Sequence, residues 1–133
     1  AVLWGVNYCL GLGATAILVL PADIPLISEM DVEFTVRLGL SQGTIVICPS
    51  ARFNGTNALL LNPPKLLETS YGLDSFRRHL ALGFSRGVKV KVYLSPRLML
   101  DIDTPEDLKA FMSMEAGKGT ETYGFCLKSL GWC

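Results

Sequence analysis

Short apolar runs and amphipathic stretches alternate along the chain, and this alternation predicts the order of its strands and helices. Apolar runs bounded by Gly, Pro or Asn, which are typical of strands buried on both faces of a sheet, occupy residues 16–20, 44–49 and 58–61. Helical spacing or capping signals, with Gly near each C-terminal end, predict helices over residues 2–12, about 28–40, and 75–86. Strands that alternate with helices indicate an α/β fold.

The last third of the chain continues the alternation. Residues 88–93 alternate strictly between apolar and polar side chains, which predicts a strand with one solvated face at a sheet edge. Residues 98–103 form an apolar run that ends in carboxylates, and they predict a further strand. Thr104 as N-cap and Pro105 at the first helical position predict a helix to about residue 114, and a short final helix is expected after it. We therefore expect a mixed sheet.

Composition and charge narrow the class of protein. The 133 residues are enough for one domain with a hydrophobic core, so residues 1–133 are taken as a single, partial domain. The formal net charge is zero and there is no basic stripe, which argues against a nucleic-acid partner. No charged side chain precedes Asp23, but Gly, Asn and Pro interrupt this stretch and it has no basic segment. It predicts a buried helix and a buried strand, not a membrane span or a secretory signal.

Two further features concern the start of the chain and its compartment. The chain begins at Ala1, not Met, and enters apolar helix-like sequence without a cap, so we expect a fragment or a protein whose front half is missing. Its four cysteines include no Cys-x-x-Cys pair, which argues against a zinc site. Cys9 and Cys48 lie in apolar runs, and the four do not resemble a disulfide framework. This favours a reducing, cytoplasmic location.

Two predicted strands end at carboxylates, and these are the candidate catalytic and metal-binding residues. Asp23 follows the first apolar run between two prolines that fix its backbone, and Asp101 and Asp103 end the run at 98–103. Ligands of open α/β sheets bind beyond the carboxyl ends of strands, where two carboxylates can hold Mg²⁺ against substrate phosphates. Asp103 is nearer the strand end and is the better ligand of its pair. Each Asp could equally be a helix cap or a turn residue.

A polar loop and a helix start supply candidate anion ligands. Residues 54–57 can offer backbone N–H groups and the Thr56 hydroxyl to an anion, although many turns have this composition. Gly72 and Ser75 stand at the start of a helix, whose N-terminus would attract phosphate or carboxylate. The alternative for this helix start is a simple N-cap. His79 has no adjacent Ser or Cys motif, so we predict no catalytic triad.

Four motifs occur together in one order and carry a family resemblance. They are Leu20-Pro21-Ala22-Asp23-Ile24-Pro25-Leu26, Asn54-Gly55-Thr56-Asn57-Ala58-Leu59-Leu60, Tyr71-Gly72 with Ser75-Phe76-Arg77-Arg78-His79, and Leu100-Asp101-Ile102-Asp103-Thr104-Pro105-Glu106-Asp107-Leu108. With this combination the chain resembles, over nearly its whole length, the 2-phospho-L-lactate guanylyltransferase family of deazaflavin coenzyme biosynthesis. The last motif alone is shared with many nucleotidyltransferases, but the combination is specific.

The resemblance implies a nucleotidyltransferase domain of the glycosyltransferase-A type, with a Rossmann-like sheet. It also implies transfer of GMP from GTP to 2-phospho-L-lactate or, in some members, to phosphoenolpyruvate, with release of pyrophosphate. Asp23 and Asp103 would hold Mg²⁺. The residues that would hold the phosphate and carboxylate of the acid are Thr56, Gly72 and Ser75, with Gly55 and Asn57 beside them in the same loop.

The chain departs from the family's pattern at its front. The family opens with a strand and a Gly-rich loop bearing Arg or Lys that grips the nucleotide, and nothing of this kind precedes Ala1. We therefore expect the first strand and most of the guanine and triphosphate site to be absent. Apolar surface left where that strand would pack could drive two copies together as a homodimer. A smaller departure is Asn54, where the family commonly has Gly.

Two other functions stay open on the sequence. The first is another nucleotidyltransferase of the same fold, which would make a sugar nucleotide or a molybdenum cofactor dinucleotide, although the loop Gly55-Thr56-Asn57 argues against it. The second is a non-catalytic domain that binds an anionic acid or serves as an assembly module. That domain would bind no GTP.

Overall fold

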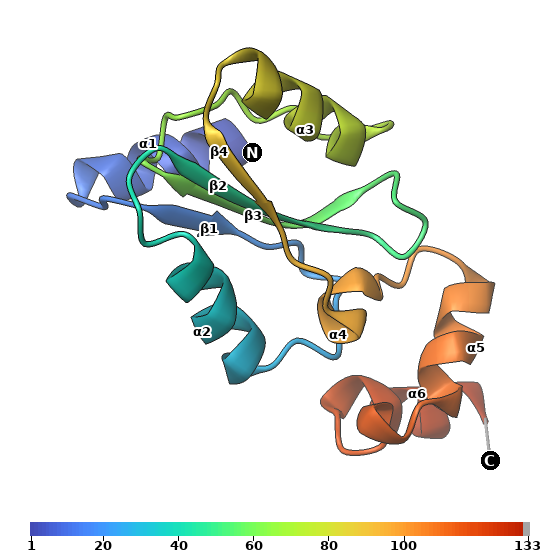
Figure 1. The fold of residues 1–133 in the computed structure, drawn as a ribbon. Helices are drawn as coiled ribbons and strands as arrows, with labels where there is room; N and C mark the ends of the chain where they lie inside the picture. Colours follow the sequence, from blue (N-terminus) through green and yellow to red (C-terminus); the bar gives the residue numbers. More distant parts are fainter. Residues whose placement is uncertain (132–133) are drawn as a thin grey trace.

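The computed structural model describes residues 1–131 and contains a four-stranded mixed sheet (Figure 1). The strands, in the order β1-β3-β2-β4 across the sheet, are β1 (Ile17–Val19), β2 (Thr44–Pro49), β3 (Thr56–Asn62) and β4 (Lys89–Val92). β3 runs antiparallel to β1 and β2, whereas β4 runs parallel to β2. The carboxyl ends of β1, β2 and β4 therefore lie at the same edge of the sheet as the first residue of β3. We call this edge the carboxyl edge.

Helices cover both faces of the sheet and continue beyond the carboxyl edge (Figure 1). One face carries α1 (Val2–Gly11) and α3 (Ser75–Ser85), and the other carries α2 (Glu29–Leu38). The helices that follow β4 are α4 (Pro96–Met99), α5 (Pro105–Ser113), the 3-10 helix η1 (Glu115–Gly117) and α6 (Glu121–Leu130). The last two α-helices confirm the predicted C-terminal helices.

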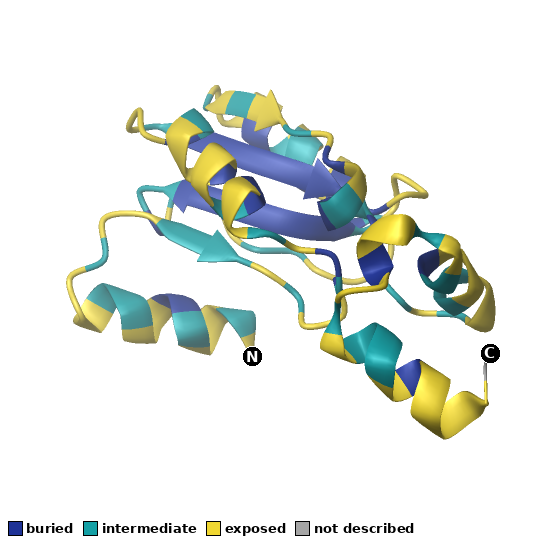
Figure 2. Cartoon of the chain, turned by 90° about the horizontal axis from the view of Figure 1, so that it is seen from below, coloured by how far each residue is buried: buried dark blue, intermediate teal, exposed yellow. Residues whose placement is uncertain are grey.

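The core is built on β2 and β3, which are covered on both faces (Figure 2). Every residue of β2 is buried, and so is every residue of β3 except the last. The α3 side of these strands packs in a cluster formed by Ile45, Ile47, Leu59, Leu61, Leu67 and Phe76. The opposite side packs against Ile24 and, in α4, Leu98. The predicted strands at 44–49 and 58–61 are confirmed, because alternate side chains point to two covered faces.

Both predicted helix-start signals before α2 and α5 form complete capping boxes. The Ser28 side chain accepts a hydrogen bond from the Asp31 N–H, and the Asp31 carboxylate accepts one from the Ser28 N–H. Thr104 and Asp107 make the same reciprocal pair at α5, where proline occupies the first turn. Each box satisfies two backbone donors that the helix itself leaves unpaired.

The strand predicted at 98–103 is wrong. The chain instead forms α4 and then an irregular segment over residues 100–103. Ser95 is the N-cap of α4, because its side chain accepts a hydrogen bond from the Leu98 N–H, and Pro96 follows at the first helical position. These two start signals outweigh the apolar run that suggested a strand.

The burial predicted for the first helix and strand is also wrong. Val6 is the one buried residue of α1 in the structure, and Trp4 is 73% exposed. β1 is half-buried along its length because, among the described strands, it pairs with β3 alone and so forms an edge of the sheet. At the opposite edge, β4 confirms the predicted solvated edge strand.

The structure also bears on the predictions about membrane spans and cysteines. No helix within residues 1–131 has both the length and the apolar character needed to cross a membrane. Cys9, Cys48 and Cys126 are free thiols. The apolar runs around Cys9 and Cys48 suggest core positions for both, but only Cys48 is buried in the core and Cys9 is half-buried. Cys133 lies outside the described residues.

Candidate functional site

The loop between β2 and β3 is closed by Ser50. The Ser50 N–H donates to the Gly55 carbonyl and the Gly55 N–H donates to the Ser50 hydroxyl, both at 2.9 Å. A Cβ at Gly55 would lie 3.1 Å from the Ser50 Oγ, so a side chain would crowd this closure. The Asn57 amide donates to the Leu98 carbonyl at 3.0 Å, which ties β3 to α4. The polar groups of Gly55 and Asn57 are thus used within the fold, and their contact with a substrate stays a prediction.

Thr56 and Ser75, two predicted anion ligands, meet at the carboxyl edge. Thr56 is the first residue of β3 and Ser75 the first of α3, and the Ser75 hydroxyl donates to the Thr56 Oγ1 at 3.1 Å. His79, one turn further along α3, lies with its Nδ1 3.0 Å from the same oxygen. All three side chains are buried, with the imidazole fully so. Sequence reasoning gave His79 no role, because nothing near it in the sequence indicates Thr56 as its partner.

Gly72 lies in the turn that leads into α3. Its φ of +102° is in the region that favours glycine, and its carbonyl accepts a hydrogen bond from the Ser75 N–H at 3.2 Å. The turn is held from α3, since an Arg78 guanidinium N–H donates to the Tyr71 carbonyl at 3.1 Å. Asp74 is the N-cap residue but makes no side-chain capping bond. Asp74 thus occupies the N-cap position that the alternative for this helix start expects, without a hydrogen bond from its side chain to the helix backbone.

The acidic segments also meet at the carboxyl edge, through their backbones. The Ile102 N–H donates to the Asp23 carbonyl at 3.0 Å, which places residues 101–103 beside the segment that follows β1. Asp23 and Asp103 are exposed and Asp101 is half-buried. Asp101 and Asp103 line a small cleft of about 60 Å³. No group of three or more His, Cys, Asp or Glu side chains within the described chain is placed to hold a metal ion.

Arg52 joins the loop after β2 to the start of α5. One of its guanidinium nitrogens lies 2.9 Å from the Asp107 Oδ1, while the Asp107 Oδ2 accepts hydrogen bonds from the Thr104 N–H and hydroxyl. The hydrogen bonds from Thr104, with the positive charge of Arg52, hold the pKa of Asp107 below its usual value. The contact places a cation at the rim of the cleft that Asp101 and Asp103 line.

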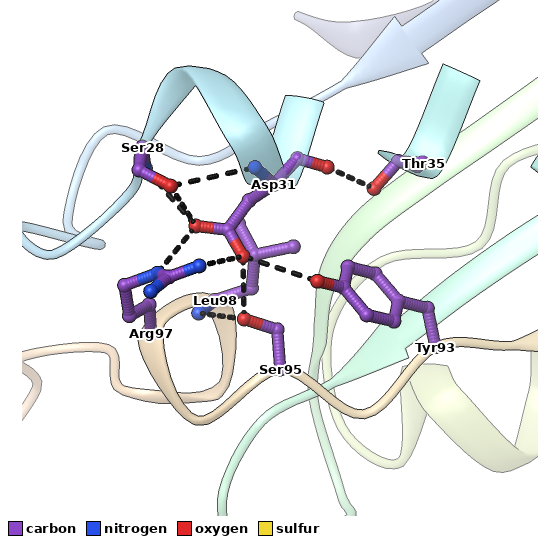
Figure 3. Close-up of polar contacts among 7 residues, drawn as sticks. All are labelled: Ser28, Asp31, Thr35, Tyr93, Ser95, Arg97 and Leu98. Carbon is purple, nitrogen blue, oxygen red and sulfur yellow. Dashed lines mark hydrogen bonds and ion pairs between the residues drawn. The ribbon is translucent and has the colours of Figure 1, made fainter. Parts of the chain in front are cut away.

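A second polar centre, around Asp31, was missed by sequence reasoning (Figure 3). The carboxylate is fully buried and accepts hydrogen bonds from the Ser95 hydroxyl at 2.7 Å and the Tyr93 hydroxyl at 3.2 Å. Arg97 donates through Nε at 2.8 Å and through Nη2 at 3.2 Å. The Ser28 hydroxyl completes the set at 2.6 Å. The sequence signals the contact with Ser28, but nothing in it signals the three partners more than sixty residues away.

The hydrogen bonds decide the charge of Asp31. Burial alone would raise its pKa, but the donors on Arg97, Ser28 and Ser95 outweigh burial and hold the pKa well below the usual range. Asp31 is therefore ionised near neutral pH and ties α2 to the segment that leads from β4 into α4. Its oxygens are occupied by donors of this chain, so it serves the fold and is not available as a ligand.

Open α/β sheets bind their ligands beyond the ends of their strands, and polar groups gather at that place here. Comparison with known proteins identifies the family. The family model described as "Guanylyl transferase CofC like" matches residues 7–133. A phosphoenolpyruvate guanylyltransferase of Rubrobacter xylanophilus is 43% identical over 109 residues, which cover 82% of this chain and 52% of the relative. A protein of the same name from Conexibacter woesei is 39% identical over 119 residues, covering 89% and 53%.

A further relative is named for 2-phospho-L-lactate instead of phosphoenolpyruvate. The 2-phospho-L-lactate guanylyltransferase of Methanocaldococcus jannaschii is 36% identical over 115 residues, which cover 86% of this chain and 50% of the relative. The chain belongs to the family of CofC-like guanylyl transferases. It spans about half the length of the curated relatives that it matches.

Proposed function

We propose that this chain supplies the acid-binding and metal-binding side of a guanylyltransferase of deazaflavin coenzyme biosynthesis. The enzyme would transfer GMP from GTP to 2-phospho-L-lactate or phosphoenolpyruvate and release pyrophosphate. The observation that carries the proposal is the carboxyl edge, where Thr56 and Ser75 stand 3.1 Å apart and the Asp23 carbonyl accepts the Ile102 N–H. Relatives whose names state these two acids support the choice of acceptor.

The chemistry needs charge neutralisation and positioning more than proton transfer. An oxygen of the acceptor's phosphate would attack the α-phosphorus of GTP, and the bond from that phosphorus to the bridging oxygen would break, so that pyrophosphate leaves. The attacking phosphate is largely ionised near neutral pH because its second pKa is about 6. No general base is then required, which agrees with a buried His79 that is already engaged by its neighbours.

The cofactor of this proposal is Mg²⁺, chosen from the chemistry of the acidic side chains. Asp23 and Asp103, with Asp101 beside them, offer hard carboxylate oxygens, and Mg²⁺ commonly takes one or two carboxylates while waters and substrate phosphates complete its shell. When bound, the ion would neutralise phosphate charge. This chain's own acids would hold it beside the anion ligands of α3 and β3.

The acid would bind at the start of α3. The Thr56 hydroxyl would donate to a phosphate or carboxylate oxygen, with Ser75 donating to Thr56 from behind, and the eleven-residue helix presents its positive end there. Gly72 lets an anion approach the backbone, since it carries no Cβ and adopts a positive φ.

The test is pyrophosphate release by the purified chain supplied with Mg²⁺, GTP and each acid in turn. We expect release with one of the two acids once the nucleotide-binding part of the enzyme is also present, and binding of that acid by this chain alone. Asp23→Asn and Asp103→Asn should lower the rate about a hundredfold or more, because a metal supplies several kcal/mol to charge stabilisation in the transition state. Glu33→Gln is the matched control, since it neutralises an exposed carboxylate on α2.

The outcomes separate the alternatives. Full activity of Asp23→Asn would overturn the metal role. If the folded chain releases no pyrophosphate with either acid, the binding of each acid and of GTP would be measured by calorimetric titration. Binding of an acid without GTP would support the acid-binding role of this chain, and lack of release even with the nucleotide-binding part present would then support the non-catalytic anion-binding domain. Binding of neither ligand would contradict the proposal.

A further inference from the structure

The hydrogen bonds around Thr56 form a chain whose direction can be worked out. Ser70, His79, Thr56 and Ser75 are linked in that order, with separations of 2.9 Å from the Ser70 nitrogen to the His79 Nε2, 3.0 Å from Nδ1 to the Thr56 Oγ1, and 3.1 Å from that oxygen to the Ser75 Oγ. One end of the chain is a backbone N–H, which can only donate. That fixed end decides the tautomer of His79 and the direction of its hydrogen bond with Thr56.

The Ser70 N–H sets the tautomer of His79. Its hydrogen points at Nε2, so Nε2 must present a lone pair, and the neutral imidazole carries its hydrogen on Nδ1. The ring is fully buried, and burial with the nearby charge of Arg78 lowers its pKa, so the ring is neutral. The Tyr71 ring packs edge-on against the imidazole with centroids 5.3 Å apart, which holds its orientation.

The tautomer of His79 determines whether a hydroxyl hydrogen remains available for a ligand. With Nδ1 protonated, the imidazole, Thr56 and Ser75 bring three hydrogens to two contacts, and one hydroxyl hydrogen is left over. The hydrogen-bond assignment in which the Ser75 hydroxyl donates to the Thr56 Oγ1 leaves this spare hydrogen on Thr56. With the opposite tautomer the imidazole hydrogen would lie on Nε2, Thr56 would donate to Nδ1, and no hydrogen would remain for a ligand.

We propose that His79 is a positioning residue that fixes the Thr56 hydroxyl as a hydrogen-bond donor toward an anionic oxygen of the acid substrate. This inference rests on the proposed function, in which Thr56 binds the acid. Thr56 then accepts from two side chains of α3 and points its single hydrogen away from them. The same imidazole holds Ser70, so the loop that carries Gly72 and the hydroxyl of Thr56 are set by one side chain.

The first test needs no substrate. His79 is the single histidine of the chain, so ¹⁵N-labelled imidazole gives one unambiguous pair of nitrogen resonances. We expect the proton-bearing shift at Nδ1 and the lone-pair shift at Nε2 near neutral pH. The reverse assignment, or an imidazolium, would overturn the inference.

The second test uses two matched variants. In His79→Asn, the side-chain amide reaches the position of Nδ1 and can still donate to Thr56, but the bond with Ser70 is lost. In His79→Gln, the side-chain amide reaches the position of Nε2 and can still accept from the Ser70 N–H, but the bond with Thr56 is lost. We expect His79→Asn to bind phosphoenolpyruvate and 2-phospho-L-lactate within about threefold of the parent chain. His79→Gln should bind them about tenfold or more weakly, since one buried partner of the site is lost.

Stability is measured beside affinity to exclude a merely structural role. Each variant loses one buried hydrogen bond, so their unfolding midpoints should fall by similar amounts. Affinities that fall equally in both variants would overturn the inference. If the parent chain binds neither acid, the proposed function fails with the substrate part of this inference, while the nitrogen shifts still decide the hydrogen-bond direction.

Discussion

Asp31 shows how one residue can connect segments that the sequence keeps far apart. It caps α2 through Ser28 and also accepts from Tyr93, Ser95 and Arg97 beyond β4. The carboxylate is fully buried, whereas the Arg97 side chain is 43% exposed. A buried charge is costly unless it is paired and hydrogen-bonded, so the network stabilises the fold only while it stays complete.

Replacing Asp31 is therefore expected to lower stability in a pH-dependent way. Asp31→Asn leaves the donors of Arg97 and Ser95 facing an amide, and the free energy of unfolding at pH 7 should fall by about 2–4 kcal/mol. The pKa of Asp31 is lowered in the folded chain, so the unfolded chain takes up this proton first as the pH falls. Its stabilisation is present above pH ~4 and is lost below it.

Urea unfolding at pH 7 and at pH 3 measures both effects. The parent chain should lose more stability between these pH values than Asp31→Asn does, because the variant lacks the titrating group. Glu33→Gln is the control, since this exposed carboxylate lies 3.9 Å from Arg37 and such pairs contribute little. An unchanged pH dependence in Asp31→Asn would contradict the role given to Asp31.

At the scale of elements, α2 and β3 are in close contact. Gly39 follows α2 with an ordinary φ of −95°, and a Cβ there would lie 2.1 Å from a methyl carbon of the buried Leu60. Gly39→Ala is therefore expected to push α2 from the sheet and to cost about 1–3 kcal/mol. Gly5→Ala in α1 meets nothing within 4 Å and should instead add a few tenths to about 1 kcal/mol through helix propensity.

The midpoints of urea unfolding compare these two glycine variants directly. Opposite signs are expected, with Gly39→Ala below the parent chain and Gly5→Ala at or above it. Equal and small effects would mean that Leu60 moves aside freely and that the contact of α2 with β3 is loose.

Elements with strong local signals could be predicted, and elements set by tertiary contacts could not. β2 and β3 contain continuous apolar runs, and α2 and α5 open with capping boxes, so their sequence determines them locally. The segment after β4 was misassigned because its apolar residues outweighed the helix start at Ser95 and Pro96. The burial of α1 depends on what packs against it, which no local pattern states.

The same distinction holds for the candidate site. Thr56, Ser75 and the acidic segments could be selected from residue type and spacing. His79 and Arg97 could not, because their partners lie 23 and 66 residues away in the sequence. Only the fold brings these groups within hydrogen-bond distance.

For the whole molecule, burial decreases from the two central strands toward the helices at both ends of the described chain (Figure 2). β2 is buried throughout, whereas α1 and α6 bury one residue each, Val6 and Cys126. Few buried apolar contacts mean that a segment opens at low free energy, without unfolding of the rest. We therefore expect amide hydrogen exchange, followed by mass spectrometry, to be slowest in β2 and β3.

Exchange in α1 and α6 should be at least about a hundredfold faster than in β2, since local opening spans from near zero to the full unfolding free energy. Val6→Ala tests the cause, because it removes the buried contact of α1. Exchange in α1 should then approach the rate of an unstructured peptide, while β2 keeps its protection. Protection of α1 equal to that of β2 would contradict this and would mean that other contacts, such as association of copies through the exposed Trp4 and Tyr8, hold the helix in place.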